Sequence, residues 1–327
     1  MMSNELLRLE HLSIRYKVED GYLSAVKDVS LGIQRGEVFA MVGESGCGKS
    51  TVAQSIMRLS MDHNEQITGN IIFKDKDLNA LSEAEMEAIR GREIGMIFQD
   101  PLDSLNPVYR VGRQVAEALM LDGMSRAQAE KRTIELFQDV QIPSPKQRIK
   151  SYPHELSGGM RQRVMIAMMI ARNPSLLIAD EPTTALDVTV EAQILQIMRR
   201  LRDQYGTSIL IITHNFGIVA EIADRVGIMY AGELVEQGPV DQVFDHPAHP
   251  YSQVLLAALP RFSKREGRIR TIDGTVPRIV GEFTGCRFAN RCPYATDKCR
   301  NSDPPIRRLN DSHFMRCHME DASWKMS

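Results

Sequence analysis

The feature that most constrains the fold is the octapeptide GESGCGKS at residues 43–50, which follows a short apolar stretch, residues 37–42. It fits the phosphate-binding pattern G-x-x-x-x-G-K-[ST], and helix-forming residues come directly after it. Its glycines let successive backbone N–H groups turn toward phosphate oxygens, and a helix N-terminus adds positive partial charge. A chance match arises on the order of once per hundred chains of this length. The strand-to-helix context lowers that rate, so we expect a phosphate-binding loop at the end of a buried strand.

This P-loop supplies the predicted phosphate contacts. Lys49 can reach the outer phosphates, and the Ser50 hydroxyl can ligate Mg²⁺. Cys47 is interpreted as a small residue that fills space, because no neighbour in sequence pairs with it. The predicted nucleotide-binding residues of this segment are Gly43, Glu44, Ser45, Gly46, Cys47, Gly48, Lys49, Ser50 and Thr51.

A second acidic strand end is needed to hold the metal, and LLIADE at residues 176–181 supplies it. Four apolar residues predict a buried strand, and Asp180 follows at its carboxyl end, where ligand sites of α/β proteins lie. We expect Asp180 to bind Mg²⁺ and Glu181 to polarise the attacking water. An isolated acidic pair usually lies in a solvated turn. In a chain that also has a P-loop, the probability of that interpretation is roughly one in ten.

Strand-like and helix-like segments alternate along the chain, which predicts an α/β fold. The region 108–152 is predicted to be a polar helical insert, and after about residue 260 the regular periodicity ends. Strands are expected near residues 7–16, 29–33, 37–42, 94–98, 176–179 and 208–213, and helices near 49–59, 111–140, 159–171 and 189–205.

Composition limits the classes of protein. The formal net charge is −2, so nothing indicates nucleic acid as a partner. The longest apolar run, residues 164–171, is far shorter than the roughly 18 residues that suggest a membrane span. We therefore expect a cytosolic protein whose membrane component, if it has one, is another subunit.

The segment LSGGMRQR at residues 156–163 closely resembles the signature sequence of ATP-binding cassette (ABC) proteins. The resemblance covers about residues 5–245. It implies a RecA-like sheet core with a β-subdomain and a helical subdomain at about 105–172, within an ATPase domain at 1–259. In that family two cassettes pair head to tail, so Ser157, Gly158 and Gly159 would contact the nucleotide held by a partner.

Further positions match the family in order. Gln99 resembles the glutamine that contacts Mg²⁺ and the attacking water, and His214 resembles the switch histidine near the γ-phosphate. Residues 185–187, ALD, look like the loop that crosses the dimer interface. Tyr16 resembles the aromatic residue that stacks on adenine, although Tyr22 is a rival. The family commonly has Asp after the switch histidine, where this chain has Asn215, which alters the charge around that histidine.

Residues 246–260 and 100–107 resemble the oligopeptide/dipeptide importer ATPases. The resemblance implies an ATP- and Mg²⁺-dependent ATPase, peripheral on the cytoplasmic face of the inner or plasma membrane. Its implied partners are a second, different ATPase subunit, two transmembrane permease subunits and, indirectly, an extracytoplasmic substrate-binding protein. Related members carry nickel, opines or glutathione, so those cargoes stay open. A soluble cassette ATPase acting on nucleic acid or ribosomes is a further alternative, as is a redox-sensing role for the tail.

Four of the five cysteines fall in the tail, residues 260–327, which is predicted to be a small extension. A cytosolic location argues against disulfides, so the cluster favours a metal. The spacings are wider than a zinc knuckle, and Cys292 precedes Pro293, which favours a 4Fe-4S cluster over zinc. The family resemblance implies the same cluster. Four free thiols are the third possibility. The predicted ligands are Cys286, Cys292, Cys299 and Cys317, with His313 and His318 as substitutes.

Overall fold

The structure is a computed structural model that describes residues 4–59, 64–99, 105–184, 187–257 and 274–319. The chain divides into two compact units, and each is described by itself. The first unit comprises Met1–Asn4, Gln34–Val38 and Leu81–Ile212; the second comprises Glu5–Ile33, Phe39–Ala80 and Thr213–Ser327.

The first unit is built on parallel strands. Strand β7 (Leu176–Asp180) lies between β6 (Ile94–Ile97) and β8 (Ser208–Thr213), and both pairings are parallel. Every residue of these strands is buried, as expected for strands covered on both faces. The α/β fold class is therefore confirmed, and the strand expected at 208–213 has the bounds that the sequence predicted.

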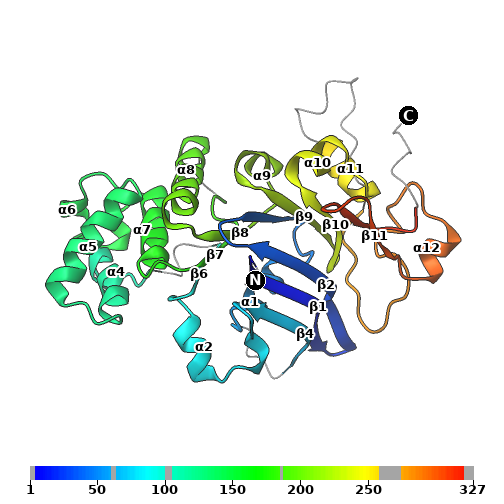
Figure 1. Ribbon diagram of the computed structural model, residues 1–327, viewed down its shortest axis with the longest axis horizontal. Helices are drawn as coiled ribbons and strands as arrows, with labels where there is room; N and C mark the ends of the chain where they lie inside the picture. Colours follow the sequence, from blue (N-terminus) through cyan, green and yellow to red (C-terminus); the bar gives the residue numbers. More distant parts are fainter. Residues whose placement is uncertain (1–3, 60–63, 100–104, 185–186, 258–273, 320–327) are drawn as a thin grey trace. The chain divides into compact units, whose positions relative to one another are not determined.

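Helices of the first unit pack on these strands and on one another. Helix α7 (Gly158–Ile170) packs on β6 and also contacts α4 and α5 (Figure 1). The other helices are α2 (Glu83–Ile89), α4 (Val111–Met120), α5 (Arg126–Asp139), α6 (Pro145–Arg148), the 3-10 turn η2 (Pro153–Glu155) and α8 (Val188–Tyr205).

The helical stretch expected at 111–140 consists of two helices in the structure. Helix α4 ends at Met120 and α5 begins at Arg126. Between them Gly123 has φ +84°, a left-handed conformation that a helix interior does not contain. Ser125 then caps α5, since its side chain accepts from the Gln128 backbone N–H. In the described part of the chain no helix is long and apolar enough to cross a bilayer.

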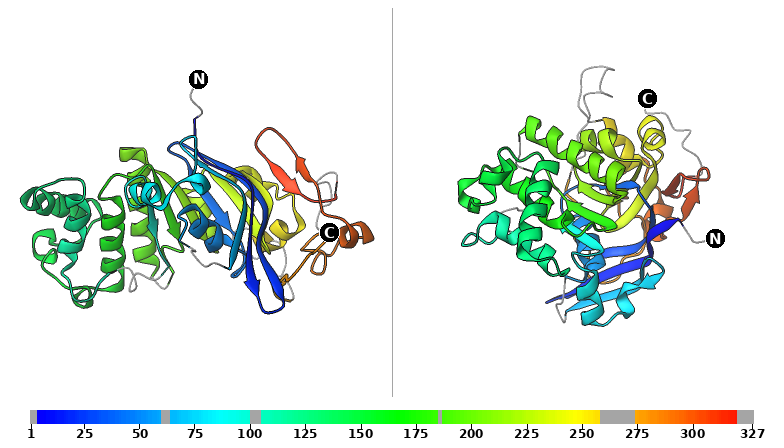
Figure 2. Two further views of the ribbon diagram at one scale, coloured as in Figure 1. Left: turned by 90° about the horizontal axis from the view of Figure 1, so that it is seen from below. Right: turned by 60° about the vertical axis from the view of Figure 1, so that its left-hand side comes forward.

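The second unit contains a four-stranded sheet in the order β2-β1-β4-β5. Strands β1 (Glu5–Val18) and β2 (Gly21–Gln34) form the long blue ribbons of Figure 2. Strand β4 (Glu65–Phe73) pairs antiparallel with β1 and with β5 (Lys76–Asp77), and the 3-10 turn η1 (Leu78–Ala80) follows. The strands expected near 7–16 and 29–33 are thus present, and both are longer than the sequence indicated.

A second group of strands carries the P-loop. Strand β3 (Val38–Val42) pairs parallel with β9 (Arg225–Tyr230), which pairs antiparallel with β10 (Glu233–Pro239). Two strands of the tail continue this group: β12 (Phe314–Arg316) pairs with β10, and β11 (Ile306–Arg308) pairs with β12. The helices of this unit are α1 (Lys49–Ile56), α9 (Phe216–Ile222), α10 (Val240–Asp245), α11 (Pro250–Ala257) and α12 (Asp297–Asn301).

Glu236 on β10 organises the start of α11. Its carboxylate accepts from the backbone N–H of Ala248 at 2.7 Å and of His249 at 2.8 Å, and it contacts His313 Nε2 at 2.7 Å. His249 is 1% exposed, and its Nδ1 accepts from the Tyr251 N–H at 3.1 Å. Burial lowers the pKa of His249 to about 4, so the ring stays neutral at pH 7.

We expect His249 to make the protein less stable as the pH falls. Its folded pKa of about 4 lies below the unfolded value of 6.5, so the unfolded chain binds the proton first between those values. This histidine should therefore remove about 2 kcal/mol from the free energy of unfolding between pH 7 and pH 5. Urea denaturation at both pH values should show that loss in the wild type and a smaller loss in His249→Gln. The exposed His246→Gln serves as the matched control, and equal losses in all three proteins would contradict the prediction.

Candidate functional site

The P-loop lies in the second unit. It joins strand β3 to helix α1, which is the strand-to-helix context that the sequence predicted. Gly46 has φ +77° and Gly48 has φ +104°, conformations that glycine adopts without strain. A Cβ on Gly48 would lie 2.6 Å from the Ala25 carbonyl oxygen, so a side chain there requires the backbone to move. Both glycines therefore fix the path of the loop.

Helix α1 begins in a way that suits an anion. Its N-cap is Gly48, no side chain caps its first turn, and no acidic residue lies in that turn. The Ser50 and Thr51 side chains at this end are partly exposed. Since the first N–H groups of a helix lack intrahelical acceptors, this terminus can bind phosphate oxygens.

Lys49 lies across the loop. Its ammonium donates to the carbonyl oxygens of Gly43 at 2.8 Å and Glu44 at 3.0 Å, and it reaches Cys47 Sγ at 3.7 Å. The Lys49 side chain is buried, which keeps its charge close to the loop. Burial raises the pKa of the Cys47 thiol, which fits its interpretation as a neutral residue that fills space.

In the first unit, β7 ends at Asp180, which is 5% exposed, and Glu181 follows with φ +46°. A left-handed conformation costs a non-glycine residue roughly 1–2 kcal/mol, and such strain concentrates at functional sites. The Glu181 N–H donates to the Ile212 carbonyl at 2.8 Å, which fixes this conformation beside β8.

Two side chains hold the Glu181 carboxylate. Gln99 follows β6 and donates from Nε2 to Glu181 Oε2 at 3.5 Å. The Thr184 hydroxyl donates to the same oxygen at 2.8 Å. The structure thus brings together Gln99 and Glu181, both assigned to the attacking water. Sequence reasoning missed Thr184, because no pattern in the sequence indicates that its hydroxyl meets the Glu181 carboxylate.

The signature segment also lies in the first unit. Ser157 caps α7, because its side chain accepts from the Met160 N–H at 3.3 Å. A Cβ on Gly159 would lie 2.7 Å from Val190 Cγ1, so α7 and α8 approach each other too closely for a side chain there. Ser157 is exposed and Gly158 is partly exposed, which leaves this helix start accessible to a second chain.

Of the residues expected at the dimer interface, Ala185 and Leu186 lie outside the described residues. Asp187 caps α8 by accepting from the Val190 N–H at 2.9 Å. Residues 100–104 of the second family-like segment also lie outside the described residues.

His214 and Asn215 follow β8 along the chain. Both belong to the second unit, and both are exposed. Asn215 accepts from the Gly217 N–H at 2.9 Å and so caps α9. The family commonly has aspartate at this position. Asn215 can cap the helix as an aspartate would, but it carries no charge. Tyr16 on β1 and Tyr22 on β2 are both partly exposed, and the Tyr22 hydroxyl accepts from Gln66 at 3.1 Å.

The predicted residues thus fall into two groups. The second unit holds Tyr16, His214 and the P-loop, whereas the first unit holds Gln99, the two carboxylates and the signature segment.

The predicted 4Fe-4S cluster is wrong, as is the zinc alternative. Within the described residues, which include all four predicted cysteine ligands, no group of three or more His, Cys, Asp or Glu side chains could hold a metal ion. The reason is geometric, because closeness in sequence does not bring three of these side chains into an arrangement that could bind an ion. Burial also raises the pKa of Cys286 to about 12 and of Cys292 to about 11.

The other predicted ligands of the cluster have the same character or other partners. Burial also raises the pKa of Cys317, and the Thr296 hydroxyl contacts Cys299 Sγ at 3.4 Å. Both substitute histidines are engaged elsewhere: His313 contacts Glu236, and His318 Nε2 lies 2.9 Å from the Ser302 carbonyl. None of these four cysteines forms a disulfide in the structure.

Two family models match the chain. Residues 26–184 match the family described as ABC transporter, and residues 235–299 match the oligopeptide/dipeptide transporter, C-terminal region. The oligopeptide transport ATP-binding protein OppD of Bacillus subtilis (strain 168) is 48% identical over 314 residues, covering 95% of this chain and 88% of that protein. The dipeptide transport ATP-binding protein DppD of the same organism is 44% identical over 319 residues, which cover 97% of this chain and 95% of that protein.

Solved structures of similar fold are ATP-binding cassettes. One is the cassette MJ0796, solved as a dimer in a post-hydrolysis state with ADP and Pi; it is 28% identical, with a TM-score of 0.65, and covers 72% of this chain and 99% of that chain. Another is cbiO1 from Clostridium perfringens, which is part of an ABC transporter complex. It is also 28% identical, with a TM-score of 0.65, and the match covers 79% of this chain and 97% of that chain.

Proposed function

This chain belongs to the ABC transporter family, and from that premise we propose that its P-loop and its acidic strand end act together in ATP-driven peptide import. It is an ATPase subunit of a peptide importer. The observation that carries this function is the similarity to peptide-import ATP-binding proteins along nearly the whole chain, including the C-terminal region of the oligopeptide/dipeptide transporters.

The P-loop binds the triphosphate of ATP through the N–H groups of the loop and of the first turn of α1. Lys49 exchanges its contacts with the loop carbonyls for the outer phosphate oxygens. Tyr16 stacks on the adenine. The uncapped start of α1 and the steric restriction at Gly48 support the assignment of the P-loop to phosphate binding.

Mg²⁺ suits the oxygen ligands that the chain offers. It prefers hydroxyl, carboxylate and amide oxygens, which Ser50, Asp180 and Gln99 carry. When bound with ATP, it neutralises charge that develops on the phosphates. The partly exposed Ser50 at the start of α1 and the Asp180 carboxylate at the end of β7 support this choice.

Glu181 orients and polarises the attacking water, with Gln99 beside it, and His214 stabilises charge near the γ-phosphate. The contacts from Gln99 and Thr184 to Oε2 support this role, because they hold the carboxylate in one orientation. Catalysis is then mainly positioning and electrostatics, as in other phosphoryl transfers.

A second cassette completes the site. Ser157, Gly158 and Gly159 contact the nucleotide that a partner's P-loop holds, and the partner's signature segment contacts the nucleotide of this chain. The exposed Ser157 at the start of α7 and the dimeric form of the related cassette MJ0796 support this arrangement. We propose that the partner is a different ATPase subunit, and that the pair lies at the cytoplasmic face of the membrane beside two permease subunits and, through them, a substrate-binding protein.

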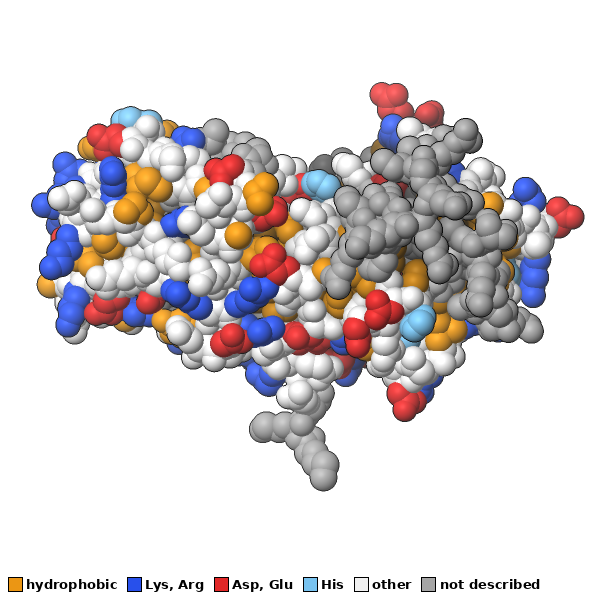
Figure 3. Space-filling model, turned by 90° about the horizontal axis from the view of Figure 1, so that it is seen from above, with side chains coloured by type: hydrophobic (Ala, Val, Ile, Leu, Met, Phe, Trp, Pro, Cys, Tyr) orange, Lys and Arg blue, Asp and Glu red, His pale blue; other side chains and the backbone are white. Residues whose placement is uncertain are grey.

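The cargo is peptide. The relatives are named for peptides, oligopeptides and dipeptides, which favours this reading over nickel, opines or glutathione. A role on nucleic acid or ribosomes is disfavoured as well, because the formal net charge of the chain is −2. On the face drawn in Figure 3, acidic and basic side chains of the described residues are interspersed.

A hollow of about 660 Å³ beside α4 and α5 suits a cytoplasmic segment of the permease. Basic side chains line it, namely Arg110, Arg113, Arg126 and Lys150, against one acidic side chain, Glu130. Val108 at its edge is 70% exposed, and Arg113 lies 4.3 Å from the Tyr109 ring centre. The lining therefore favours a permease segment with both apolar and acidic side chains.

Val108→Asp is expected to weaken binding to the permease, because it places a carboxylate where an acidic partner segment would pack. Co-purification with tagged permease subunits should fall severalfold, whereas ATP binding by the isolated chain should stay unchanged. Leu121→Asp is the matched control, since Leu121 is 75% exposed and does not line the hollow. Equal recovery of both variants with the permease would rule out this docking surface.

Affinity purification of the tagged chain from native membranes tests the assignment as a whole. Two permease subunits and one second cassette ATPase should come with it. Recovery with ribosomal or DNA-bound proteins instead would refute the importer assignment.

A further inference from the structure

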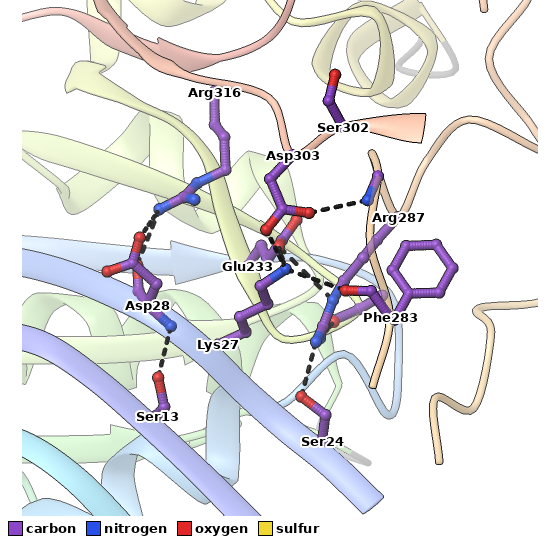
Figure 4. Close-up of polar contacts among 12 residues, drawn as sticks. Ser13, Ser24, Lys27, Asp28, Glu233, Phe283, Arg287, Ser302, Asp303 and Arg316 are labelled. Atoms are coloured by element: carbon purple, nitrogen blue, oxygen red, sulfur yellow. Dashed lines mark hydrogen bonds and ion pairs between the residues drawn. The ribbon is translucent and has the colours of Figure 1, made fainter. Parts of the chain in front are cut away.

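The described part of the C-terminal tail, residues 274–319, is attached to strand β2 through ion pairs (Figure 4). Lys27 Nζ donates to Asp303 Oδ2 at 2.7 Å, and Arg316 Nη2 donates to Asp28 Oδ2 at 2.8 Å. The Arg316 side chain is 7% exposed, so solvent screens its ion pair less than a surface pair. These contacts hold the tail in place within the second unit.

Arg287 connects the tail to a turn that touches the P-loop. Its guanidinium donates to Ser24 Oγ at 2.7 Å, as Figure 4 shows, and also to the Ala231 carbonyl. The next residue, Gly232, donates its N–H to the Cys47 carbonyl in the P-loop at 2.8 Å. The tail therefore supports the loop indirectly through this turn.

Arg291 connects the tail to the P-loop directly. Its Nη1 donates to Glu44 Oε2 at 3.1 Å and to the Tyr230 hydroxyl at 3.3 Å. The guanidinium also lies over the Tyr230 ring, 5.6 Å from its centre, and the Phe288 ring packs edge-on against that tyrosine. The Arg291 side chain is 8% exposed and that of Glu44 is 28% exposed, so this ion pair is partly shielded from solvent.

Glu44 links Arg291 to the phosphate-binding lysine. The Glu44 carbonyl accepts from Lys49 Nζ at 3.0 Å and from the Cys47 N–H at 3.3 Å. The Glu44 N–H donates to the Tyr251 hydroxyl at 3.2 Å. The Glu44 carbonyl therefore takes part in the hydrogen bonds within the loop, and Arg291 binds its carboxylate.

The charges in this contact have a consequence for nucleotide binding. A carboxylate inside a phosphate-binding loop repels the polyanion that the loop must hold. The Arg291 guanidinium offsets the Glu44 charge and keeps the carboxylate turned toward the tail. We propose that Arg291 is a positioning residue of the P-loop, through which the C-terminal tail sets the affinity of the chain for ATP. This inference rests on the proposed function of the P-loop in ATP binding.

Arg291→Met keeps the length of the side chain and removes its charge. We expect it to raise the dissociation constant for ATP about tenfold in the full-length chain, since an uncompensated carboxylate then faces the phosphates. Arg291→Lys keeps the charge and should restore most of the affinity. Fluorescence titration with a labelled ATP analogue measures this. Arg300→Met is the matched control, because Arg300 lies in the same tail and is 53% exposed; its affinity should equal that of the wild type.

A double-mutant cycle separates this mechanism from a general loss of structure. In chains that carry Glu44→Gln, we expect Arg291→Met to change the dissociation constant by less than about twofold, since no carboxylate is left to offset. Wild-type affinity in Arg291→Met, or an equally large loss with and without Glu44→Gln, would overturn the inference. Failure of the wild-type chain to bind ATP would instead refute the proposed function.

Discussion

Glu181→Gln is expected to lower ATP turnover by the assembled importer about a hundred- to a thousandfold, a loss typical of removing a catalytic base. Glutamine has nearly the same shape and can still accept the hydrogen bond from Thr184, but it cannot polarise water as a carboxylate does. ATP binding should be retained, since the residue does not belong to the P-loop. Phosphate release and nucleotide retention by the purified complex measure the two effects.

The control for this variant is Glu87→Gln, which changes an exposed glutamate on α2 in the same unit. Its turnover should match that of the wild type. Near-normal turnover in Glu181→Gln would refute the role assigned to Glu181, whatever the control shows.

Lys49→Met is expected to weaken ATP binding about a hundredfold, because charge-assisted hydrogen bonds to phosphate are worth about 1.5–3 kcal/mol each. The ammonium already lies at the loop, held by the carbonyls of Gly43 and Glu44. Methionine fills similar space without donating. Equilibrium binding of ATP to the isolated full-length chain measures the effect.

Lys76→Met is the matched control, because Lys76 lies exposed on β5 in the same unit. Its affinity for ATP should not change. Unchanged affinity in Lys49→Met would show that the loop does not bind phosphate through this lysine.

The local parts of the site could be predicted from the sequence. The loop at 43–50 carries its own requirements, glycines with positive φ and a helix start, so pattern and structure agree. Four apolar residues before Asp180 identified a buried strand in the same way. These features depend on neighbours in sequence, and local patterns record such neighbours well.

Contacts between distant residues could not be predicted. Arg291 and Glu44 lie 247 positions apart, and nothing in either segment indicates the other. The irregular tail gave no sign that β12 pairs with β10. The left-handed conformation of Glu181 and its contact with Thr184 depend on β8 and on the turn after β7, which no pattern specifies.

The cysteines show where spacing misleads. Four cysteines within a short tail predicted a cluster, because the sequence shows how many potential ligands lie close together along the chain. The arrangement of the side chains decides whether they bind an ion, and among the described residues no group of three or more could do so. The count of cysteines alone therefore did not decide the chemistry.

The central claim is that ATP hydrolysis by this chain drives peptide import. Its most direct test is the purified importer, with its permease subunits and second ATPase, reconstituted in liposomes with ATP on the side of the cassettes and with the substrate-binding protein and labelled peptide opposite. We predict peptide accumulation that requires ATP and that Glu181→Gln abolishes. Peptide accumulation that continues at the wild-type rate in Glu181→Gln, or without ATP, would contradict the claim.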